Sequence, residues 1–272
     1  MTDIVNTLEE KALIIKNQLL TLASKESIHI GGDLSSLDVM TALWQYKMKY
    51  FPDDPKNEAR DRFILSKGHA SALLNLQQAM LGCFPVEKVY EEYAHDESMF
   101  AMHACNLLNP FVEVSTGSLG HGLAIGCGIA SALKLKGNTE SKVYVLMGDG
   151  EQSEGSVWEA AMNAAHLKLN NLIAIVDFNG LSSDGTIKEM TSLSNLSEKY
   201  RAFGWNPVVV NGHNMTQIVY ALDHIDTESE YPNVLIAKTV KGHGVSFMEN
   251  NVRWHAGKLN PEQYEEAIGG AK

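Results

Sequence analysis

The chain has 272 residues, of which 44% are hydrophobic and 20% charged, as in a globular protein with one substantial core. The formal net charge of −11 argues against broad nucleic-acid binding, although local amides, lysines or histidines can still bind a small anion. No apolar run approaches the ~20 residues of a membrane span, and the acidic N-terminus is not typical of a signal peptide.

The first half of the chain predicts helices around one short strand. Residues 4–23 space their apolar side chains as in an amphipathic helix, and residues 35–50 begin with two serines and continue as a second helix. The apolar run RFILS at 62–66 predicts a strand, which a helix over 68–81 follows. The segment VSTGSLGHGLAIGCGIASALKLKG, at 114–137, predicts a Gly-rich turn that leads into a helix of small residues.

The second half alternates strands with helices. Strands are predicted at 143–147, 171–178, 207–210 and 233–240, and helices at 156–169, 195–204 and 215–225. The strands are apolar without alternation, as expected when helices cover both faces of a sheet. We therefore expect an α/β fold with a doubly wound, mainly parallel sheet and helices on both faces.

The chain shows no internal repeat and no convincing linker, so we expect a single domain over residues 1–272. From about residue 250 the sequence is polar and helix-prone, which predicts a tail that is mobile or faces a partner. The three cysteines, Cys83, Cys105 and Cys127, form no CxxC pair, so we expect free structural thiols and a cytoplasmic protein.

The most informative motif is GDG, which follows the strand VYVLM directly. Gly148 and Gly150 let backbone amides approach a phosphate closely, and Asp149 between them can hold a metal ion on that phosphate. Thirty residues after Asp149, the strand LIAIVDF delivers Asn179 to a comparable position. A carboxylate and an amide oxygen suit a hard cation such as Mg²⁺, so the pair predicts a metal–diphosphate site.

Four polar segments follow predicted strands directly: LSKGH, GDG, DFNG and KTVKGHG. In an open parallel sheet they lie along one rim, where such folds bind ligands. Two other interpretations compete with the metal–diphosphate site. GDG alone is also typical of a tight turn. GCGIAS, from Gly126, resembles part of a dinucleotide-binding motif, but it lies inside a predicted helix, where its glycines favour close packing.

Longer segments resemble a known family over nearly the whole chain. DRFILSKGHASALL, VSTGSLGHGLA, GDGEQSEGSVWEAAMNAAHLKLNNLIAIVDFN and KGHGVSFMENNVRWHAG are similar to the N-terminal domain of transketolase. This resemblance implies the diphosphate-binding (PP-type) fold, thiamine diphosphate as the cofactor, and Mg²⁺, or Ca²⁺ or Mn²⁺ in its place. It also implies Asp149, Asn179 and the main-chain carbonyl of Leu181 as metal ligands, with Gly148 and Gly150 along the diphosphate.

The resemblance also assigns roles to histidines. His69 would contact the cofactor diphosphate or the substrate, while His29, His103 and His255 would contact substrate hydroxyls and transfer protons. Imidazoles suit these tasks because they donate hydrogen bonds and exchange protons near neutral pH. His121 takes the place of a frequent glutamine. His243 has a less secure match, and the remaining histidines are interpreted as structural or surface residues: His95, His166, His213 and His224.

Further cofactor contacts are implied in the same way. Gly117 and Leu119 match a loop beside the aminopyrimidine ring, and Asp177 matches a residue near the cofactor. Glu154 and Glu159 follow GDG on the next helix. They suit a helix N-terminus in any protein, but match family glutamates that link the two active sites of a dimer.

The implied reaction is the transfer of a two-carbon ketol unit from a ketose, or its phosphate, to an aldose acceptor on thiamine diphosphate. The family's activating glutamate lies in a pyrimidine-binding domain that follows the matched region. We therefore expect a split transketolase, with a second chain carrying that domain, as a heterotetramer. The segments HIGGDLS and FAMHACNLLNPFVEV depart from the family pattern beside the sugar channel, which favours a branched or sulfonated sugar as an alternative substrate.

Two alternatives stay open. The α subunit of a 2-oxo acid dehydrogenase also carries GDG and a distant asparagine, although the TGSLGHG and KGHGVSFMENN segments argue against it. The chain could also be a binding or regulatory half that keeps the fold without catalysis. The metal ligands and the placed histidines argue against that second interpretation.

Overall fold

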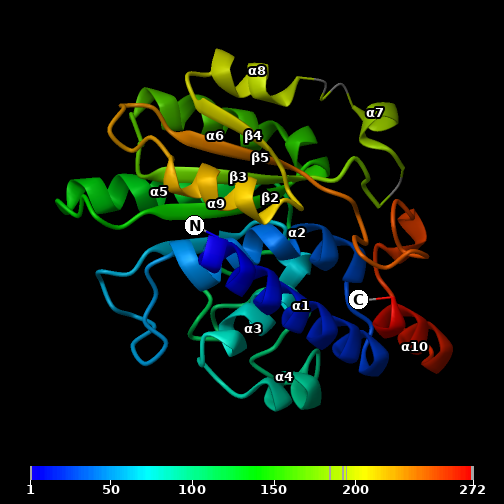
Figure 1. Ribbon diagram of the computed structural model, residues 1–272. Helices are drawn as coiled ribbons and strands as arrows, with labels where there is room; N and C mark the ends of the chain where they lie inside the picture. Colours follow the sequence, from blue (N-terminus) through cyan, green and yellow to red (C-terminus); the bar gives the residue numbers. More distant parts are fainter. Residues whose placement is uncertain (1, 184, 192, 194, 271–272) are drawn as a thin grey trace.

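A five-stranded sheet with strand order β1-β2-β3-β5-β4 lies at the centre of the computed structural model, which describes residues 2–183, 185–191, 193 and 195–270 (Figure 1). The strands are β1 (Arg62–Leu65), β2 (Val143–Gly148), β3 (Leu172–Phe178), β4 (Asn206–Asn211) and β5 (Asn233–Lys238). All four strand pairs are parallel, which confirms the predicted α/β architecture.

Helices cover both faces of the sheet (Figure 1). One core contains residues of α1 (Thr2–Lys25), α2 (Ile30–Ala42), α3 (Ser71–Met80), α4 (Val86–Glu92), α9 (Met215–Asp223) and α10 (Pro261–Gly269). The other contains residues of α5 (Gly122–Leu135), α6 (Gly155–His166) and α8 (Leu196–Ala202). A short helix, α7 (Ile187–Met190), lies in the segment after β3.

Consecutive strand residues alternate between the two cores. In β1, Phe63 and Leu65 belong to the α1–α2 side, whereas Ile64 belongs to the α5–α6 side. In β2, Leu146 belongs to the α1–α2 side and Val145 to the α5–α6 side. Because both faces of the central strands are buried, most of their positions are apolar, with Asp177 near the end of β3 as an exception, which explains the missing alternation in the sequence.

The helices differ from the prediction in several places. α2 begins at Ile30, five residues earlier than expected, with His29 at its N-cap, and its end continues into a π-helical turn at Leu43–Lys47. The helix predicted from residue 68 opens with a 3₁₀ turn, Gly68–Ala70. The helices α4 and α7 fall in segments without a predicted helix, because seven and four residues are too short for periodicity to mark.

The segment after residue 250, expected as a polar tail, packs against the N-terminal helices as far as residue 270. Ile28 and Gly257 exchange two backbone hydrogen bonds of 3.1 and 2.9 Å, and the amide of Leu259 donates to the carbonyl of Ala23 over 2.8 Å. Ala267 of α10 is buried in the core of α1. The polar composition of this segment did not predict the packing, because the packing depends on a few buried apolar side chains, such as Leu259 and Ala267.

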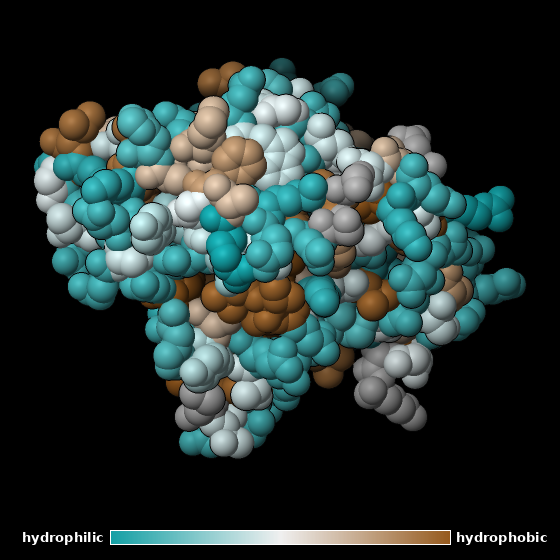
Figure 2. Space-filling model, turned by 90° about the horizontal axis from the view of Figure 1, so that it is seen from above, coloured by the Kyte–Doolittle hydropathy of each residue, from teal (hydrophilic) through white to brown (hydrophobic). Residues whose placement is uncertain are grey.

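The surface is consistent with the composition of the chain. Figure 2 shows separate hydrophobic patches surrounded by hydrophilic residues on the face seen from above. Among the residues that the structure describes, no helix combines the length and apolar character that crossing a membrane needs. All three cysteines are free, as predicted.

The two glycines of GCGIAS make different contacts on α5. A Cβ atom on Gly126 would lie 2.6 Å from Cγ2 of Val145, so the helix approaches the sheet closely there. A Cβ atom on Gly128 would meet no atom within 4 Å, and this residue is exposed. Gly126 is therefore a packing residue, as predicted, and Gly128 is not.

This difference predicts opposite effects of the same substitution. Gly126→Ala should lower the free energy of unfolding by about 1–3 kcal/mol, because the methyl group overpacks the interface with β2. Gly128→Ala should raise it by about 0.5–1 kcal/mol, because alanine favours an exposed helix. Urea denaturation measures both, and equal stability of Gly126→Ala and the wild type would contradict the close packing.

Asp33, in the first turn of α2, is fully buried. Its Oδ1 accepts a hydrogen bond from the amide of Leu73 over 3.3 Å, and its Oδ2 has no partner among the described residues. Burial raises the pKa of Asp33 from 3.8 to about 7. In the folded state the ionised carboxylate is therefore destabilising, and the penalty grows as the pH rises from about 4 to about 7.

We expect Asp33→Asn to stabilise the protein more at pH 8 than at pH 5, because it removes a buried charge and keeps an acceptor for Leu73. Each unit of the pKa shift corresponds to about 1.4 kcal/mol. Thermal denaturation of the variant and the wild type at both pH values measures the effect. Asp53→Asn, at an exposed position, is the control. A pH-independent gain for Asp33→Asn would show that its carboxyl group titrates normally.

Candidate functional site

A cavity of about 310 Å³ opens at the carboxyl ends of the strands, where parallel sheets bind ligands. Residues that follow β1, β2, β3 and β5 line it, and they come from all four of the polar segments that the sequence placed on one rim. Its lining residues include Lys67, His69, Leu119, Gly148, Asp149, Gly150, Glu151, Glu154, Asn179, Leu181, Ser182, Lys241 and His255.

Asp149 lies at the start of a 3₁₀ turn, Gly150–Ser153, and is 2% exposed. Its two oxygens accept hydrogen bonds from the amides of Gly150, over 2.8 Å, and Gly180, over 2.6 Å. Burial, and next the charge of Asp177, raise the pKa of Asp149 to about 7. Among the described residues Asp149 has no ion-pair partner, so a bound cation would relieve the cost of its buried charge.

Asn179 and Leu181 line the same cavity, beside Asp149. Oδ1 of Asn179 accepts a hydrogen bond from the amide of Leu181 over 3.1 Å, and Nδ2 donates to Asp177 over 3.2 Å. The bond from Gly180 to Asp149 ties this turn to the GDG turn. The structure thus brings the three predicted metal ligands together, and their oxygen chemistry fits a hard cation.

Asp177, at the end of β3, forms a buried ion pair with Lys67, whose Nζ lies 2.6 Å from its Oδ2. Oγ of Ser35 donates to the same oxygen over 2.6 Å, and Thr239 donates to Oδ1. Burial by itself would raise the pKa of Asp177, but the charge of Lys67 and these hydrogen bonds outweigh it and hold the pKa below its usual range. Asp177 therefore stays ionised and does not need an added cation.

Lys241 brings a second cation to the cavity. Its Nζ donates to the carbonyl of Ser182 over 3.2 Å and lies 3.0 Å from Nδ1 of His255. Burial, and next the charge of Lys67, lower the pKa of Lys241 to about 8. The charges of Asp149 and Asp177 only partly offset these effects, so a buried lysine beside Lys67 suits an anionic ligand, which would reduce the repulsion between the two cations.

Glu151 joins the two Gly-rich segments of the site. It is almost fully buried and accepts hydrogen bonds from Ser66, from the amide of Gly120 over 2.7 Å, and from the amide of Gly148 over 3.1 Å. Burial raises its pKa above the ordinary value. Glu151 therefore fixes the GDG turn against the STGSLG loop, whereas the sequence singled out Glu154.

Most of the predicted cofactor contacts line the cavity. A Cβ atom on Gly148 would meet no atom within 4 Å, so this position leaves room for a close ligand. Leu119 and Glu154 line the wall, and Gly117 lies against the ring of His103. Glu159 of α6 is exposed and outside the cavity. The open glycine, the buried Asp149 and the two lysines fit a metal-bound diphosphate.

The four predicted histidines form one cluster. The ring centroid of His29 lies 5.3 Å from that of His69, 5.5 Å from His103 and 5.4 Å from His255. Burial, and next the charge of His103, lower the pKa of His29 to about 4, and its Nδ1 is buried without a partner among the described residues. Burial, and next Lys67, lower the pKa of His69 well below the ordinary value. His29 and His69 are therefore neutral hydrogen-bonding groups near pH 7.

Sequence reasoning missed five site residues: Ser35, Lys67, Glu151, Thr239 and Lys241. All five lie in or beside segments that the sequence analysis names: Ser35 in HIGGDLS, Lys67 in SKGH, Glu151 after GDG, and Thr239 and Lys241 in KTVKGHG. No local pattern showed that Ser35 and Thr239 turn toward Asp177, which is 142 and 62 residues away in the sequence.

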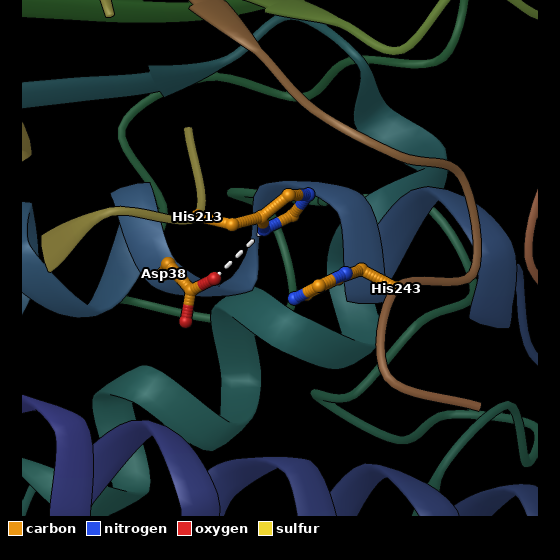
Figure 3. Close-up of side chains that lie close together, drawn as sticks. All are labelled: Asp38, His213 and His243. Carbon is orange, nitrogen blue, oxygen red and sulfur yellow. Dashed lines mark hydrogen bonds and ion pairs between the residues drawn. The ribbon is translucent and has the colours of Figure 1, made fainter. Parts of the chain in front are cut away.

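Asp38, His213 and His243 form a second polar cluster (Figure 3). Nδ1 of His213 lies 2.8 Å from Oδ2 of Asp38, and Nε2 accepts a hydrogen bond from the amide of Val240 over 2.9 Å. Since a neutral imidazole carries one proton, Nδ1 must donate to Asp38. A metal ion at Nδ1 would displace that proton, so the contacts do not favour a metal site. His213 instead ties α2 to the segment after β5.

His243 stacks on His213 with ring centroids 3.5 Å apart, and its Nδ1 lies 3.4 Å from Oε1 of Glu249. The other histidines that the sequence set aside, His95, His166 and His224, are exposed, as is His121.

The sequence of this chain is similar to those of known proteins over most of its length. The family model described as "Transketolase, thiamine diphosphate binding domain" matches residues 12–268. An apulose-4-phosphate transketolase subunit from Phocaeicola vulgatus is 43% identical over 265 residues, which are 97% of this chain and 93% of that protein. The 6-deoxy-6-sulfo-D-fructose transketolase subunit SqwG of Clostridium sp. is 35% identical over 262 residues, 96% of this chain and 94% of that protein.

Longer transketolases match over part of their length. Human transketolase is 37% identical over 240 residues, 88% of this chain and 38% of that protein. The structure of Pichia stipitis transketolase with sedoheptulose 7-phosphate has a TM-score of 0.88 and 31% identity, and covers 96% of this chain and 41% of that one. With a family model that spans residues 12–268, the chain belongs to the transketolase family, as its thiamine diphosphate-binding domain.

Proposed function

We propose that the chain is the diphosphate-binding subunit of a two-chain transketolase that transfers a two-carbon ketol unit from a ketose to an aldose. The observation that carries this proposal is the cavity that gathers Asp149, Asn179 and Leu181 beside two lysines and the cluster of four histidines. Such a cavity suits a metal-bound diphosphate at its base and a polyhydroxylated substrate above it.

In this proposal the chain holds the cofactor by its charged end. Asp149, Asn179 and the carbonyl of Leu181 bind Mg²⁺, or Ca²⁺ or Mn²⁺. The positive charge of the metal ion compensates the buried negative charge of Asp149. Gly148 leaves space for the phosphates, Gly150 lines the same cavity, and Lys241 donates to the phosphate oxygens. Thiamine diphosphate, when bound, supplies the carbon nucleophile and the electron sink for C–C cleavage.

The histidines act on the sugar. His29, His69, His103 and His255 lie within reach of one another, so their ring nitrogens can hydrogen-bond neighbouring hydroxyls of one substrate. Because His29 and His69 are neutral near pH 7, each can accept a hydrogen bond at its unprotonated ring nitrogen and donate one from its N–H to a hydroxyl or a developing alkoxide. In this proposal the aminopyrimidine ring would lie beside Leu119, which lines the cavity, and Gly117, which lies against the ring of His103.

A second chain completes the enzyme in this proposal, as a heterotetramer of two copies of each. The two relatives named as subunits match this chain over 93% and 94% of their own length, whereas human transketolase matches over 38%. That pattern supports a partner that carries the pyrimidine-binding domain and its activating glutamate. The free thiols Cys83, Cys105 and Cys127 agree with a cytoplasmic location.

The substrate in this proposal is a ketose with a branched or sulfonated carbon skeleton. By their names, the two relatives described as subunits use apulose 4-phosphate and 6-deoxy-6-sulfo-D-fructose. This chain also departs from the transketolase pattern in the segment that carries His103, where Leu107 and Leu108 are exposed.

Asp149→Asn should weaken Mg²⁺-dependent binding of thiamine diphosphate by about 10- to 100-fold or more, because it removes the charge that holds the metal. Isothermal titration calorimetry of the chain, with its partner chain where binding requires it, measures the affinity. Glu140→Gln, an exposed carboxylate outside the cavity, is the matched control. Unchanged affinity in Asp149→Asn would remove this residue from the metal site.

The partner requirement is tested by an assay of ketol transfer with thiamine diphosphate and Mg²⁺. The chain alone should be inactive, and adding a chain with a transketolase pyrimidine-binding domain should restore turnover, most rapidly with a branched or sulfonated ketose. Xylulose 5-phosphate serves as the unmodified comparison substrate. Full activity of the purified chain alone would overturn the two-chain proposal.

A further inference from the structure

Helix α2 is connected to the ends of β3 and β5 through Asp177. Ser35, in the second turn of α2, donates to Oδ2 of Asp177, the last buried residue of β3. Thr239, directly after β5, donates to the other oxygen of Asp177. These two bonds fix the ends of the strands against the helix.

The same helix makes a second connection one turn further on. Asp38, three residues after Ser35, accepts from Nδ1 of His213, whose Nε2 accepts from the amide of Val240. His213 belongs to the turn between β4 and α9, and Val240 follows Thr239 in the chain. The bonds through Asp177 and through His213 therefore form a closed ring that begins and ends on α2.

Just after β5, the side chain of His213 takes over from the neighbouring strand as the hydrogen-bond acceptor for the backbone. The amide of Thr239 still donates to the carbonyl of Phe178 over 3.1 Å, in line with the strand pairing. The next amide, of Val240, donates to Nε2 of His213 instead. Because an amide N–H can only donate, Nε2 carries no proton, and His213 must be the Nδ1–H tautomer that donates to Asp38.

The residue after Val240 is Lys241, which enters the cavity and approaches Ser182 and His255. A lysine side chain has many rotamers, so its position depends on how firmly its backbone is held. Here the backbone before it is bound by His213, and the amide of Gly242 after it donates to the carbonyl of Gly31 over 3.0 Å.

We propose that His213, as the Nδ1–H tautomer held by Asp38, is a positioning residue that places Lys241 for the anionic part of the ligand by binding the amide of Val240. The inference rests on the proposed function, because it gives Lys241 a diphosphate to bind. His213 is not among the residues that line the cavity. His243 stacks on its ring without bonding to the amide of Val240, which makes His243 a matched control.

The tautomer is measured directly by ¹⁵N-detected NMR of histidine-labelled full-length protein. We expect His213 to show a protonated Nδ1 and an unprotonated Nε2 in the wild type. Hydrogen exchange of the Val240 amide should be slow in the wild type and in His243→Leu, and at least about tenfold faster in His213→Leu. A protonated Nε2 in the wild type would overturn the proposal, whether or not any ligand binds.

A double-mutant cycle tests the coupling to Lys241. The affinity for Mg²⁺-pyrophosphate is measured by calorimetry for the wild type, His213→Leu, Lys241→Met and the double variant. By analogy with residues that orient metal ligands, each single change should cost about 10- to 100-fold. The double variant should bind no more weakly than Lys241→Met alone, because His213 acts through that lysine. Multiplied losses would overturn the proposal.

Variants of Asp38 show whether a loss of affinity for Mg²⁺-pyrophosphate comes from the position of His213 or from misfolding. Asp38→Asn keeps an acceptor for Nδ1 and should retain affinity within about threefold, whereas Asp38→Leu should resemble His213→Leu. If the wild type binds Mg²⁺-pyrophosphate and the His213 variants bind equally well, positioning fails and the proposed function stands. If the wild type does not bind it, the proposed diphosphate site fails, and the tautomer and exchange measurements still decide the role of His213.

Discussion

The buried carboxylate of Asp177 is the group around which this site is organised. Taking a carboxylate out of water costs several kcal/mol unless other groups replace its hydration. Lys67 supplies the opposite charge at 2.6 Å, and the remaining lone pairs are taken by Ser35, Thr239 and Asn179. These donors come from α2 and from the ends of β1, β3 and β5, so one charge holds four parts of the chain at the rim where the cavity opens.

Asp149 is also a buried carboxylate, but it has no ion pair like the one between Asp177 and Lys67 among the described residues. It follows Gly148, which pairs with Asp177 across β2 and β3, so the two carboxylates share one buried environment. The pKa of Asp177 lies below its usual range because Lys67 is committed to it, whereas burial and the charge of Asp177 raise the pKa of Asp149 to about 7. The protein has thus neutralised one carboxylate from within and left the other for a cation from outside, which supports the metal site that we propose.

The sequence predicted what depends on local order along the chain and missed what depends on distant contacts. The strands were recognisable because residues buried on both faces are continuously apolar, and parallel pairing then required GDG and Asn179 to share a rim. Ser35 could not be recognised, because its partner Asp177 lies 142 residues away. Glu151 was passed over for Glu154, since no pattern in a short polar segment shows which carboxylate turns inward. The same limit hid the docking of the segment after residue 250, which Leu259 and Ala267 anchor.

Charged and neutral hydrogen-bonding groups meet in the cavity, where Nζ of Lys241 lies 3.0 Å from Nδ1 of His255. Lys67 and Lys241 keep cations on the side of Asp149 and Asp177, and their charge adds to burial in keeping the pKa of His69 low. A protonated imidazole there would be repelled by two lysines, so His29 and His69 stay neutral near pH 7 and match hydroxyls better than phosphates. Because His29 and His69 carry no charge near pH 7, these two residues can bind polar groups of a ligand but do not by themselves select a negatively charged one.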